Sequence, residues 1–374
     1  MDLSFGEEQE ALRGLAAEIF RGRVSHDRLK EVEAGPDRVD RALWTELARA
    51  NLLGVGVPEE LGGVGGGILE ACILLEQAGA AVAPVPLWPA IVLGAIPLAE
   101  LGTREQKESL LPGLVAGEVI LSAALVEPDS DDLLHPRTAA SWEGDAWRLE
   151  GAKTAVPAAH VAGRVLTPAS SADGAGVFLL DPGAGGVTLA RQDATSGEVL
   201  SMMTLDGAAV PEAEVVVEPG ARPEAPARIV DLAVVGLCAL QVGLAESALR
   251  LTAEYTSGRE QFGRPLAKFQ AVQQRAADCY IDVQAMRWTM WQAAWRLSEG
   301  LPATEEVAIA KFWAAEGGQR VLSAAQHLHG GIGVDKEYPL YRYTVWSKQV
   351  ELTLGAATPQ LVRLGDELAR KAGV

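Results

Sequence analysis

The sequence places an arginine beside an aromatic side chain at a glycine-marked break between two helical segments. The stretch is YTSGREQFGRPLAKFQAVQQRAAD (residues 255–278), and its central pair is Arg259 and Phe262. A guanidinium group can bind a pyrophosphate through paired hydrogen bonds, and an aromatic ring can stack on a flat heterocycle. Taken alone, the pattern indicates nucleotide binding no more strongly than a surface arginine beside a core phenylalanine, because one such pair is not diagnostic.

A second stretch, QHLHGGIGVDKEYPLYRY (residues 326–343), carries a helical pattern into Gly330 and Gly331. Glycines at such a point allow a phosphate or nucleotide to lie against exposed backbone N–H groups. The alternative is an ordinary helix C-cap followed by a turn. The motif does not follow a strand, as the glycine fingerprint of a dinucleotide-binding βαβ unit would, so by itself it is weak evidence.

The elements that must position these stretches follow from the spacing of apolar residues. From residue 5 to about 116 they recur at helical spacing, and from about 121 to 217 short alternating segments separated by Gly, Pro, Asp and Ser predict strands. Beyond about residue 226 the pattern predicts long helices, of which the strongest lie at 229–255, 267–298 and 305–327, and then two shorter ones. The expected fold is α+β.

Composition and charge exclude several classes of protein. The 374 residues are 48% hydrophobic with a formal net charge of −18, which fits a globular protein and argues against a general nucleic-acid binder. The three cysteines are isolated and the five histidines lack metal-binding spacing, so we expect neither a disulfide nor a metal site. The acidic amphipathic start, and the lack of an uninterrupted apolar run of about 18 residues, predict a cytoplasmic protein without a membrane span.

Four motifs in this order resemble the acyl-CoA dehydrogenase family, and the resemblance covers essentially the whole chain. They are GVGVPEELGGVGGG (54–67), GTREQKESLLPGLVAGE (102–118), REQFGRPLAKFQAVQ (259–273) and HLHGGIG (327–333). The resemblance implies an N-terminal α-helical domain (1–120), a middle antiparallel β domain (121–220) and a C-terminal four-helix bundle (226–374). It also implies FAD bound between subunits and an acyl-CoA thioester as the substrate.

In that family two sets of groups hold FAD, and one set reaches the FAD of a neighbouring subunit. On the resemblance, the residues of this set are Arg259, Gln261, Phe262, Gln270, Gly330 and Gly331. His327 stands where the family usually has Gln, which keeps a hydrogen-bonding group at that position.

The other set would hold the flavin on the chain's own β domain, and here the sequence departs from the family. The family has Thr-Glu-Pro followed by a small residue, Gly and Ser, and later Trp-Ile-Thr or Trp-Ile-Ser after a Lys. This chain has VEP (126–128) followed by DSDD, and Lys153 is followed by TAVP. Asp131 and Asp132 would add negative charge beside a cofactor that carries a pyrophosphate. We therefore expect an impaired flavin site of the chain's own.

The family's chemistry removes a proton from the carbon alpha to the thioester while hydride passes from the beta carbon to the flavin, which requires a carboxylate base. On the resemblance, the two positions that the family uses for this base fall at Leu354 and Ala233, and neither side chain can take a proton. Asp231 lies two residues from Ala233, and Glu351 lies about one helical turn before Leu354. Either carboxylate could act as the base only if the true alignment with the family contains a gap, because both positions were counted without one.

The loss of the base and of the chain's own flavin contacts, with the neighbour-facing groups retained, forms one pattern. It resembles the non-catalytic subunit of heteromeric actinobacterial acyl-CoA dehydrogenases that act on steroid side-chain CoA thioesters. The resemblance implies a related, base-carrying partner subunit in an α2β2 hetero-oligomer, with electron-transfer flavoprotein as the electron acceptor. Two alternatives stay open: a self-sufficient homotetramer that uses Asp231 or Glu351, and a flavin-free structural homologue.

Overall fold

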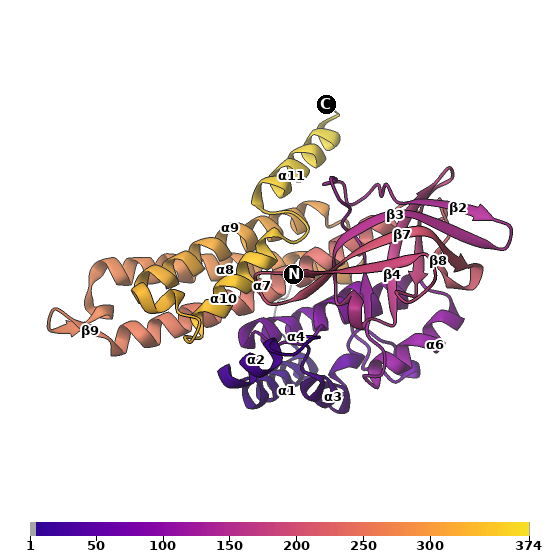
Figure 1. The fold of residues 1–374 in the computed structure, drawn as a ribbon. Coiled ribbons are helices and arrows are strands. Elements are labelled where there is room, and N and C mark those ends of the chain that lie inside the picture. Colours follow the sequence, from indigo (N-terminus) through magenta and orange to yellow (C-terminus); the bar gives the residue numbers. More distant parts are fainter. Residues whose placement is uncertain (1–4, 374) are drawn as a thin grey trace. The chain divides into compact units, whose positions relative to one another are not determined.

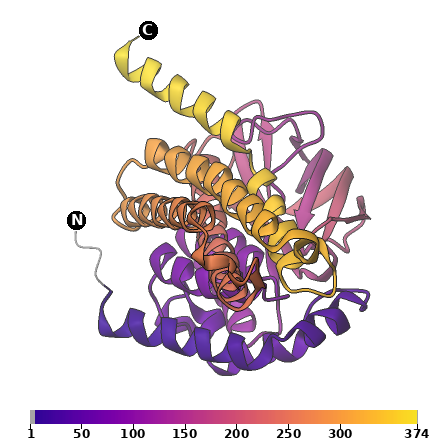
Figure 2. The same ribbon diagram turned by 90° about the vertical axis from the view of Figure 1, so that its left-hand side faces the viewer.

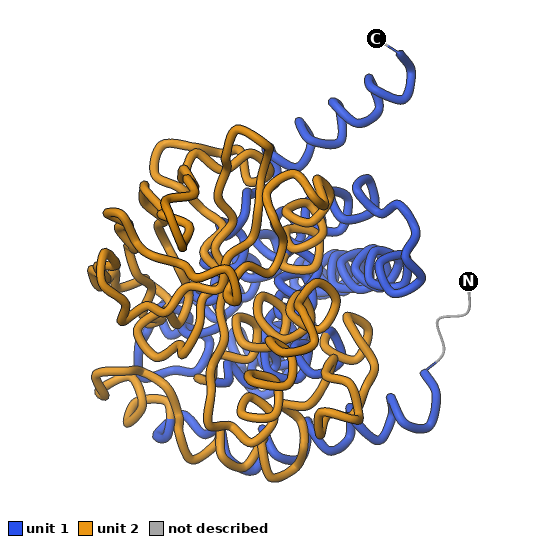
Figure 3. Tube along the Cα trace, turned by 90° about the vertical axis from the view of Figure 1, so that its right-hand side faces the viewer, with its two compact units in different colours: residues 1–28, 72–83, 234–374 blue, residues 29–71, 84–233 orange. Residues whose placement is uncertain are grey.

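The computed structural model describes residues 5–373. The chain forms two compact units, coloured separately in Figure 3: residues 1–28, 72–83 and 234–374 make unit 1, and residues 29–71 and 84–233 make unit 2. Three helices cross the division; they are α2 (His26–Glu33), α4 (Ile68–Ala81) and α7 (Ala225–Gly258). Unit 1 is mainly helical, whereas unit 2 combines a sheet with shorter helices (Figure 1). The expected three-domain division stays a prediction.

Unit 2 is built around an eight-stranded sheet with the order β6-β7-β3-β2-β4-β5-β8, and β1 pairs with β4 beside this path. The strands are β1 (Leu121–Ala123), β2 (Ala139–Glu143), β3 (Ala146–Pro157), β4 (Arg164–Ser171), β5 (Gly174–Leu180), β6 (Val187–Asp193), β7 (Val199–Pro211) and β8 (Val215–Val217). Most neighbouring strands are antiparallel, as the sequence predicts, but β1 and β2 each run parallel to β4. Parallel pairing needs a connection longer than a hairpin, and other strands of the sheet supply it here.

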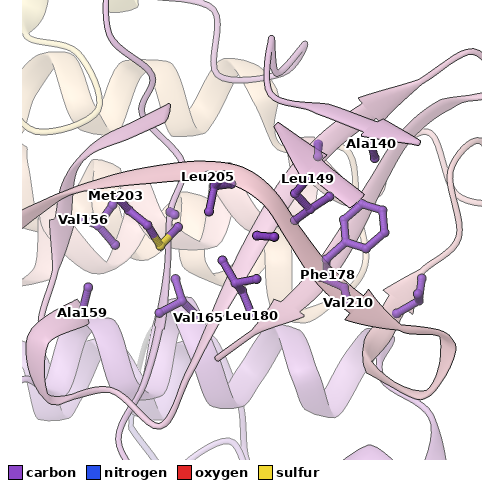
Figure 4. Close-up of a cluster of buried hydrophobic side chains, with 14 residues drawn as sticks. Ala140, Leu149, Val156, Ala159, Val165, Phe178, Leu180, Met203, Leu205 and Val210 are labelled. Carbon is purple, nitrogen blue, oxygen red and sulfur yellow. The ribbon is translucent and has the colours of Figure 1, made fainter. Parts of the chain in front are cut away.

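The strands of this sheet enclose a hydrophobic core (Figure 4). Leu149 on β3, Val165 on β4, Phe178 on β5 and Leu205 on β7 are at most 2% exposed. Burying each side chain of this kind stabilises the fold by roughly 1.5–3 kcal/mol. Buried positions recur at every second residue along much of β7, the period that identifies a half-buried strand from sequence.

The rest of unit 2 is helical, and two of its helices begin at capping residues. The Asp40 carboxylate accepts hydrogen bonds from two backbone N–H groups at the start of α3 (Arg41–Arg49). Thr103 and Gln106 form a capping box at the start of α6 (Arg104–Val115). The other helical segments are η1 (Leu52–Gly54), η2 (Glu59–Leu61), the π-helix η3 (Trp88–Ala95), α5 (Ile96–Leu101), η4 (Ala159–Val161) and η5 (Glu212–Glu214).

Unit 1 contains α8, α9 and most of α7, the three long helices that the sequence predicts, and Figure 2 shows the chain from the left-hand side of Figure 1. Its elements are α1 (Glu7–Arg23), the second parts of α4 and α7, β9 (Glu260–Gln261), β10 (Arg264–Pro265), η6 (Leu266–Lys268), α8 (Gln270–Ser298), α9 (Thr304–His329), η7 (Gly330–Val334), α10 (Leu340–Leu352) and α11 (Ala357–Ala372). The predictions at 229–255, 267–298 and 305–327 are confirmed as α7, α8 and α9, with shifts of a few residues at their ends.

Two glycines allow α4 and α7 to approach each other closely within unit 1. A Cβ at Gly79 would lie 2.3 Å from the carbonyl oxygen of Leu240, and one at Gly243 would lie 2.0 Å from that of Glu76. Any side chain at either position would collide with backbone, so this helix contact requires glycine on both sides.

Helix α7 is long and apolar enough to cross a membrane by length and composition alone. However, 89% of its most apolar window is buried inside the structure, as a central core helix requires. Its apolar character is therefore explained by packing, while the expected lack of a membrane span and the cytoplasmic location stay predictions.

Candidate functional site

A short hairpin joins α7 to α8 and carries several of the candidate cofactor-binding residues. Phe262 and Gly263 form the turn between β9 and β10, with φ of 56° and 75°. Left-handed backbone at both positions suits a two-residue hairpin, but it costs a bulky residue such as Phe on the order of 1–3 kcal/mol. Phe262 is 92% exposed, so burial within the described chain does not offset that cost. An exposed aromatic ring on a strained hairpin tip is suited to contact with another molecule.

The polar candidates beside this turn are accessible. Arg259, Gln261 and Gln270 are all exposed. Among residues 5–373 the Arg259 guanidinium has no hydrogen-bond or ion-pair partner, whereas its backbone N–H is fixed to the carbonyl of Tyr255 at 2.8 Å. An unpaired guanidinium on anchored backbone is suited to bind an anion such as a pyrophosphate.

The second candidate segment begins where α9 ends, at His329. Gly330 has φ 66° and ψ −143°, a conformation that favours glycine, and its N–H bonds to the carbonyls of Gln326 and His327. A Cβ added at Gly330 or Gly331 would meet no atom within 4 Å, so packing within the described residues does not require the second glycine. Open glycine backbone of this kind lets a phosphate or ribose approach closely. The His327 side chain is exposed beside it.

The departures from the family pattern in the β domain coincide with a buried ion pair. The Glu127 carboxylate accepts hydrogen bonds from Lys153 Nζ at 2.7 Å, and from the hydroxyl and N–H of Thr138 at 2.6 and 2.8 Å. The side chains of Glu127 and Lys153 are 4% and 0% exposed. Burial raises the pKa of Glu127, but the bonds to Lys153 and Thr138 outweigh it and lower that pKa to about 2. The pair anchors the loop after residue 127 to β3, so both groups have a structural role.

The groups that follow Lys153 are also bonded within unit 2. Gln192 on β6 donates to the Thr154 hydroxyl at 3.1 Å and accepts from the Ala155 N–H at 3.0 Å. Ala155 has φ 50°, in a region where β3 and β7 lose their regular register. The Thr154 hydroxyl and the Ala155 N–H are therefore already bonded to a side chain of the same sheet.

The acidic loop after residue 128 carries the negative charge that the sequence indicates, and both Asp131 and Asp132 are exposed. Asp132 accepts hydrogen bonds from the His135 ring at 2.9 Å and from two backbone N–H groups, which outweigh burial, lower its pKa and keep it charged. The residues present on this sheet do not fit a complete flavin site. The hairpin and the glycine turn of unit 1 fit the pyrophosphate and ribose portion of such a cofactor.

The chain forms an anchored turn at position 354, but the residue there is leucine. Leu354 is 6% exposed and has φ 57°, in the turn between α10 and α11. Gln360 donates to its carbonyl at 3.1 Å, and Lys311 Nζ donates to the carbonyls of Val350 and Glu351 at 2.5 and 3.3 Å. The end of α10 is therefore anchored just before the position, although the side chain there cannot accept a proton.

The two weaker candidates for the base lie in different units. Glu351 in unit 1 is 9% exposed, and its carboxylate accepts a hydrogen bond from Lys348 at 2.5 Å. Asp231 in unit 2 is 8% exposed on α7. Ala233 is fully buried, and its carbonyl accepts a hydrogen bond from Trp88 Nε1 at 3.0 Å. Neither carboxylate stands at position 354 or 233, so a role for either as base stays a prediction.

Sequence patterns did not reveal the anchoring role of Lys311. Its only signal is a lone lysine in the apolar run VAIAKFWAA (307–315), and its partners come from another helix. Lys311 is 0% exposed, and burial lowers its pKa to about 8. A lysine with a lower pKa in the folded state binds more protons when unfolded, so its destabilising effect is full below pH 8 and disappears as the pH rises toward about 10.5.

We therefore expect the wild type to gain roughly 2–3 kcal/mol of unfolding free energy relative to Lys311→Met between about pH 7 and pH 10. Urea unfolding of both proteins at the two pH values measures this difference. Comparing the two proteins cancels the titration of the other groups. Parallel pH dependence in the two proteins would show that Lys311 is charged to the same extent in both states.

Comparisons with known proteins agree with these features. The family models "Acyl-CoA dehydrogenase, N-terminal domain" and "Acyl-CoA dehydrogenase, C-terminal domain" match residues 6–118 and 231–368. The chain is 38% identical to acyl-CoA dehydrogenase FadE27 of Mycobacterium tuberculosis over 99% of both chains. A solved structure of a variant of the Tcur3481–Tcur3483 steroid ACAD matches with TM-score 0.93 and 45% identity, over 99% of this chain and 100% of that one. The ChsE4–ChsE5 complex from Mycobacterium tuberculosis matches with TM-score 0.93 and 39% identity, over 99% of both chains.

Proposed function

Because this chain belongs to the acyl-CoA dehydrogenase family, we propose that it is the subunit without a catalytic base in a heteromeric acyl-CoA dehydrogenase, where it completes an FAD site shared with a related partner subunit. Enzymes of this family are oxidoreductases that act on the CH–CH bond of an acyl-CoA thioester. The partner subunit would supply the carboxylate that removes the alpha proton.

The observation that carries the proposal is the intact turn around Leu354. Its anchors, Lys311 and Gln360, hold the backbone at the position where the family places its base, yet the side chain is apolar and 6% exposed. An apolar residue in this turn cannot take part in proton transfer. At the second position used by the family, Ala233 is equally unable to act as a base.

Members of the family bind FAD, which supplies the hydride acceptor for the reaction. In this chain the residues that would hold it are Arg259, Gln261, Phe262, Gln270, His327, Gly330 and Gly331. Their exposure supports contact with a cofactor seated mainly on another chain. The guanidinium of Arg259 would bind the pyrophosphate, and the Phe262 ring would pack on a flat part of the cofactor.

The substrate that we propose is a steroid side-chain CoA thioester. The similarity to a structure described as a steroid ACAD supports the substrate, and the similarity to a complex of two differently named chains supports a hetero-oligomer, for which we propose an α2β2 assembly. Electron-transfer flavoprotein as the acceptor, and a cytoplasmic location, belong to the same proposal.

The flavin absorbance of the purified chain tests the proposal, measured first with the chain alone and then after co-expression with the chain that its neighbouring gene encodes. We expect little FAD on the chain alone and about one FAD per two polypeptides in the complex. Near one FAD per chain without a partner would instead support a self-sufficient enzyme that uses Asp231 or Glu351. No flavin in either preparation would identify a flavin-free structural homologue.

A further inference from the structure

A cluster of three rings joins the two cofactor-facing segments of unit 1. The Tyr255 and His329 rings stack with centroids 4.4 Å apart and planes 19° from parallel. The Tyr338 ring lies 5.3 Å from the His329 ring and 6.4 Å from the Tyr255 ring. Tyr255 stands one helical turn before Arg259, and His329 directly precedes Gly330. The cluster therefore lies at the base of both the hairpin and the glycine turn.

The hydrogen bonds of His329 fix one tautomer of a neutral imidazole. Nδ1 lies 2.8 Å from the carbonyl of Ala325, which can only accept, so Nδ1 carries the proton. Nε2 then has a lone pair, and the Tyr338 hydroxyl donates to it at 3.2 Å. The Tyr255 hydroxyl donates to the backbone carbonyl of His329 at 3.4 Å. One side chain thus links α7, the end of α9 and the segment before α10.

Protonation of this imidazole would leave its bond to the Ala325 carbonyl in place but change its contacts with Tyr338 and with the Tyr255 ring. His329 is 4% exposed, and burial lowers its pKa, opposed in part by the bond to the Ala325 carbonyl. The other titratable groups at the cluster are Tyr255 and Glu254 on α7 and Tyr338 itself; burial raises the pKa of Tyr338, and Tyr255 and Glu254 add to the rise. A proton on Nε2 takes away the lone pair that accepts from the Tyr338 hydroxyl, so that this hydroxyl must turn to accept instead, and it places a charge inside a buried stack.

We propose that His329 is a positioning residue that couples the hairpin carrying Arg259 to the glycine turn at Gly330, so that its protonation loosens both segments together and releases the cofactor. The coupling path is short. The Arg259 N–H bonds to the carbonyl of Tyr255, the Tyr255 ring stacks on His329, and Gly330 follows in the chain. This inference rests on the proposed function, because it takes both segments to face FAD.

The expected pH range follows from the direction of the shift. A histidine with a lower pKa in the folded state stabilises its surroundings fully above its ordinary value of about 6.5, and this stabilisation is lost as the pH falls below that value. The neutral form therefore predominates at pH 7, and loosening should begin below about pH 6.5.

Hydrogen exchange at about pH 7.5 and about pH 5.5 tests the coupling, on the chain alone and in the complex. After correction for intrinsic exchange rates, we expect amides in 259–265 and in 330–334 to exchange several-fold faster at the lower pH. His329→Phe keeps a stacked ring but cannot titrate, so the increase should vanish in both segments. His135→Asn, which removes an exposed histidine from unit 2, should behave as the wild type. An unchanged pH response in His329→Phe, or a response confined to one segment, would overturn the coupling.

FAD release from the assembled complex provides a second readout. We expect release to be several-fold faster at the lower pH in the wild type and nearly independent of pH in His329→Phe. Tyr338→Phe removes only one hydroxyl, so it preserves packing and should already speed exchange in 330–334 at about pH 7.5. If the complex holds no FAD but both segments still exchange faster together at low pH, the shared flavin site is disproved and the coupling through His329 stands. If the complex holds FAD but hydrogen exchange in these variants matches the wild type, only the coupling is disproved.

Discussion

Replacing Arg259 with alanine is expected to weaken FAD binding by the assembled complex roughly 30-fold or more. The Arg259 guanidinium is exposed and has no partner within residues 5–373, so in the proposed complex its donors are available to a pyrophosphate. Removing one side of a hydrogen-bonded charge pair in an interface costs about 2–5 kcal/mol, and about 1.4 kcal/mol corresponds to a tenfold change in affinity. Equilibrium dialysis, or flavin fluorescence on dilution, measures the effect.

Two further variants separate phosphate binding from damage to the hairpin. Arg259→Lys keeps the charge but loses the planar fork, so an intermediate affinity is expected. Arg264→Ala removes a neighbouring guanidinium that stacks on Phe269 at 4.1 Å, which tests whether a weakened hairpin alone releases flavin. The thermal stability of Arg259→Ala should be close to that of the wild type, because the guanidinium has no hydrogen-bond or ion-pair partner among residues 5–373. Unchanged FAD affinity in a folded Arg259→Ala complex would remove Arg259 from the site.

Most of the helix and strand order could be predicted because each element shows its own period in the sequence. The alternation along β7 and the helical spacing along α8 and α9 depend only on which face of each element is buried. Strand pairing does not have such a local signal. The parallel contacts of β1 and β2 with β4 join residues far apart in the chain, so the prediction of an antiparallel domain missed them.

The candidate site could be predicted where function depends on exposed or flexible backbone. The residue types of Arg259, Phe262 and Gly330 suggest a function because packing alone does not explain them. The structure places each of them on an accessible surface. The buried polar contacts could not be found in this way. Gln241 bonds to Ser347 at 2.6 Å between α7 and α10, and each residue by itself is a common helix residue. The sequence shows such residues but not their partners, which only the packing of helices brings together.

Glu127 is another buried polar residue whose partner the sequence does not reveal, and replacing it is expected to have a large effect on stability. Sequence comparison identified this residue as part of a motif that had lost its flavin contacts, but not as the partner of a fully buried lysine. Glu127→Gln is expected to destabilise the chain by about 3–5 kcal/mol at pH 7, because Lys153 would then remain as an uncompensated buried charge. Urea or guanidinium unfolding, followed by the sheet signal in circular dichroism, measures the loss. Asp131→Asn, on the same loop but exposed, serves as the matched control and should change stability little.

The double variant Glu127→Gln with Lys153→Met shows whether the lost free energy comes from the charge pair. Replacing both partners removes the buried charge, so this protein should recover a large part of the stability lost in Glu127→Gln. The pH dependence provides an independent check. Because the pKa of Glu127 is lowered to about 2, its stabilisation is present above about pH 4.5 and is lost as the pH falls toward 2, roughly 3 kcal/mol in all. A Glu127→Gln protein within about 1 kcal/mol of the wild type, with the same acid sensitivity, would mean that the buried pair contributes little to the β domain.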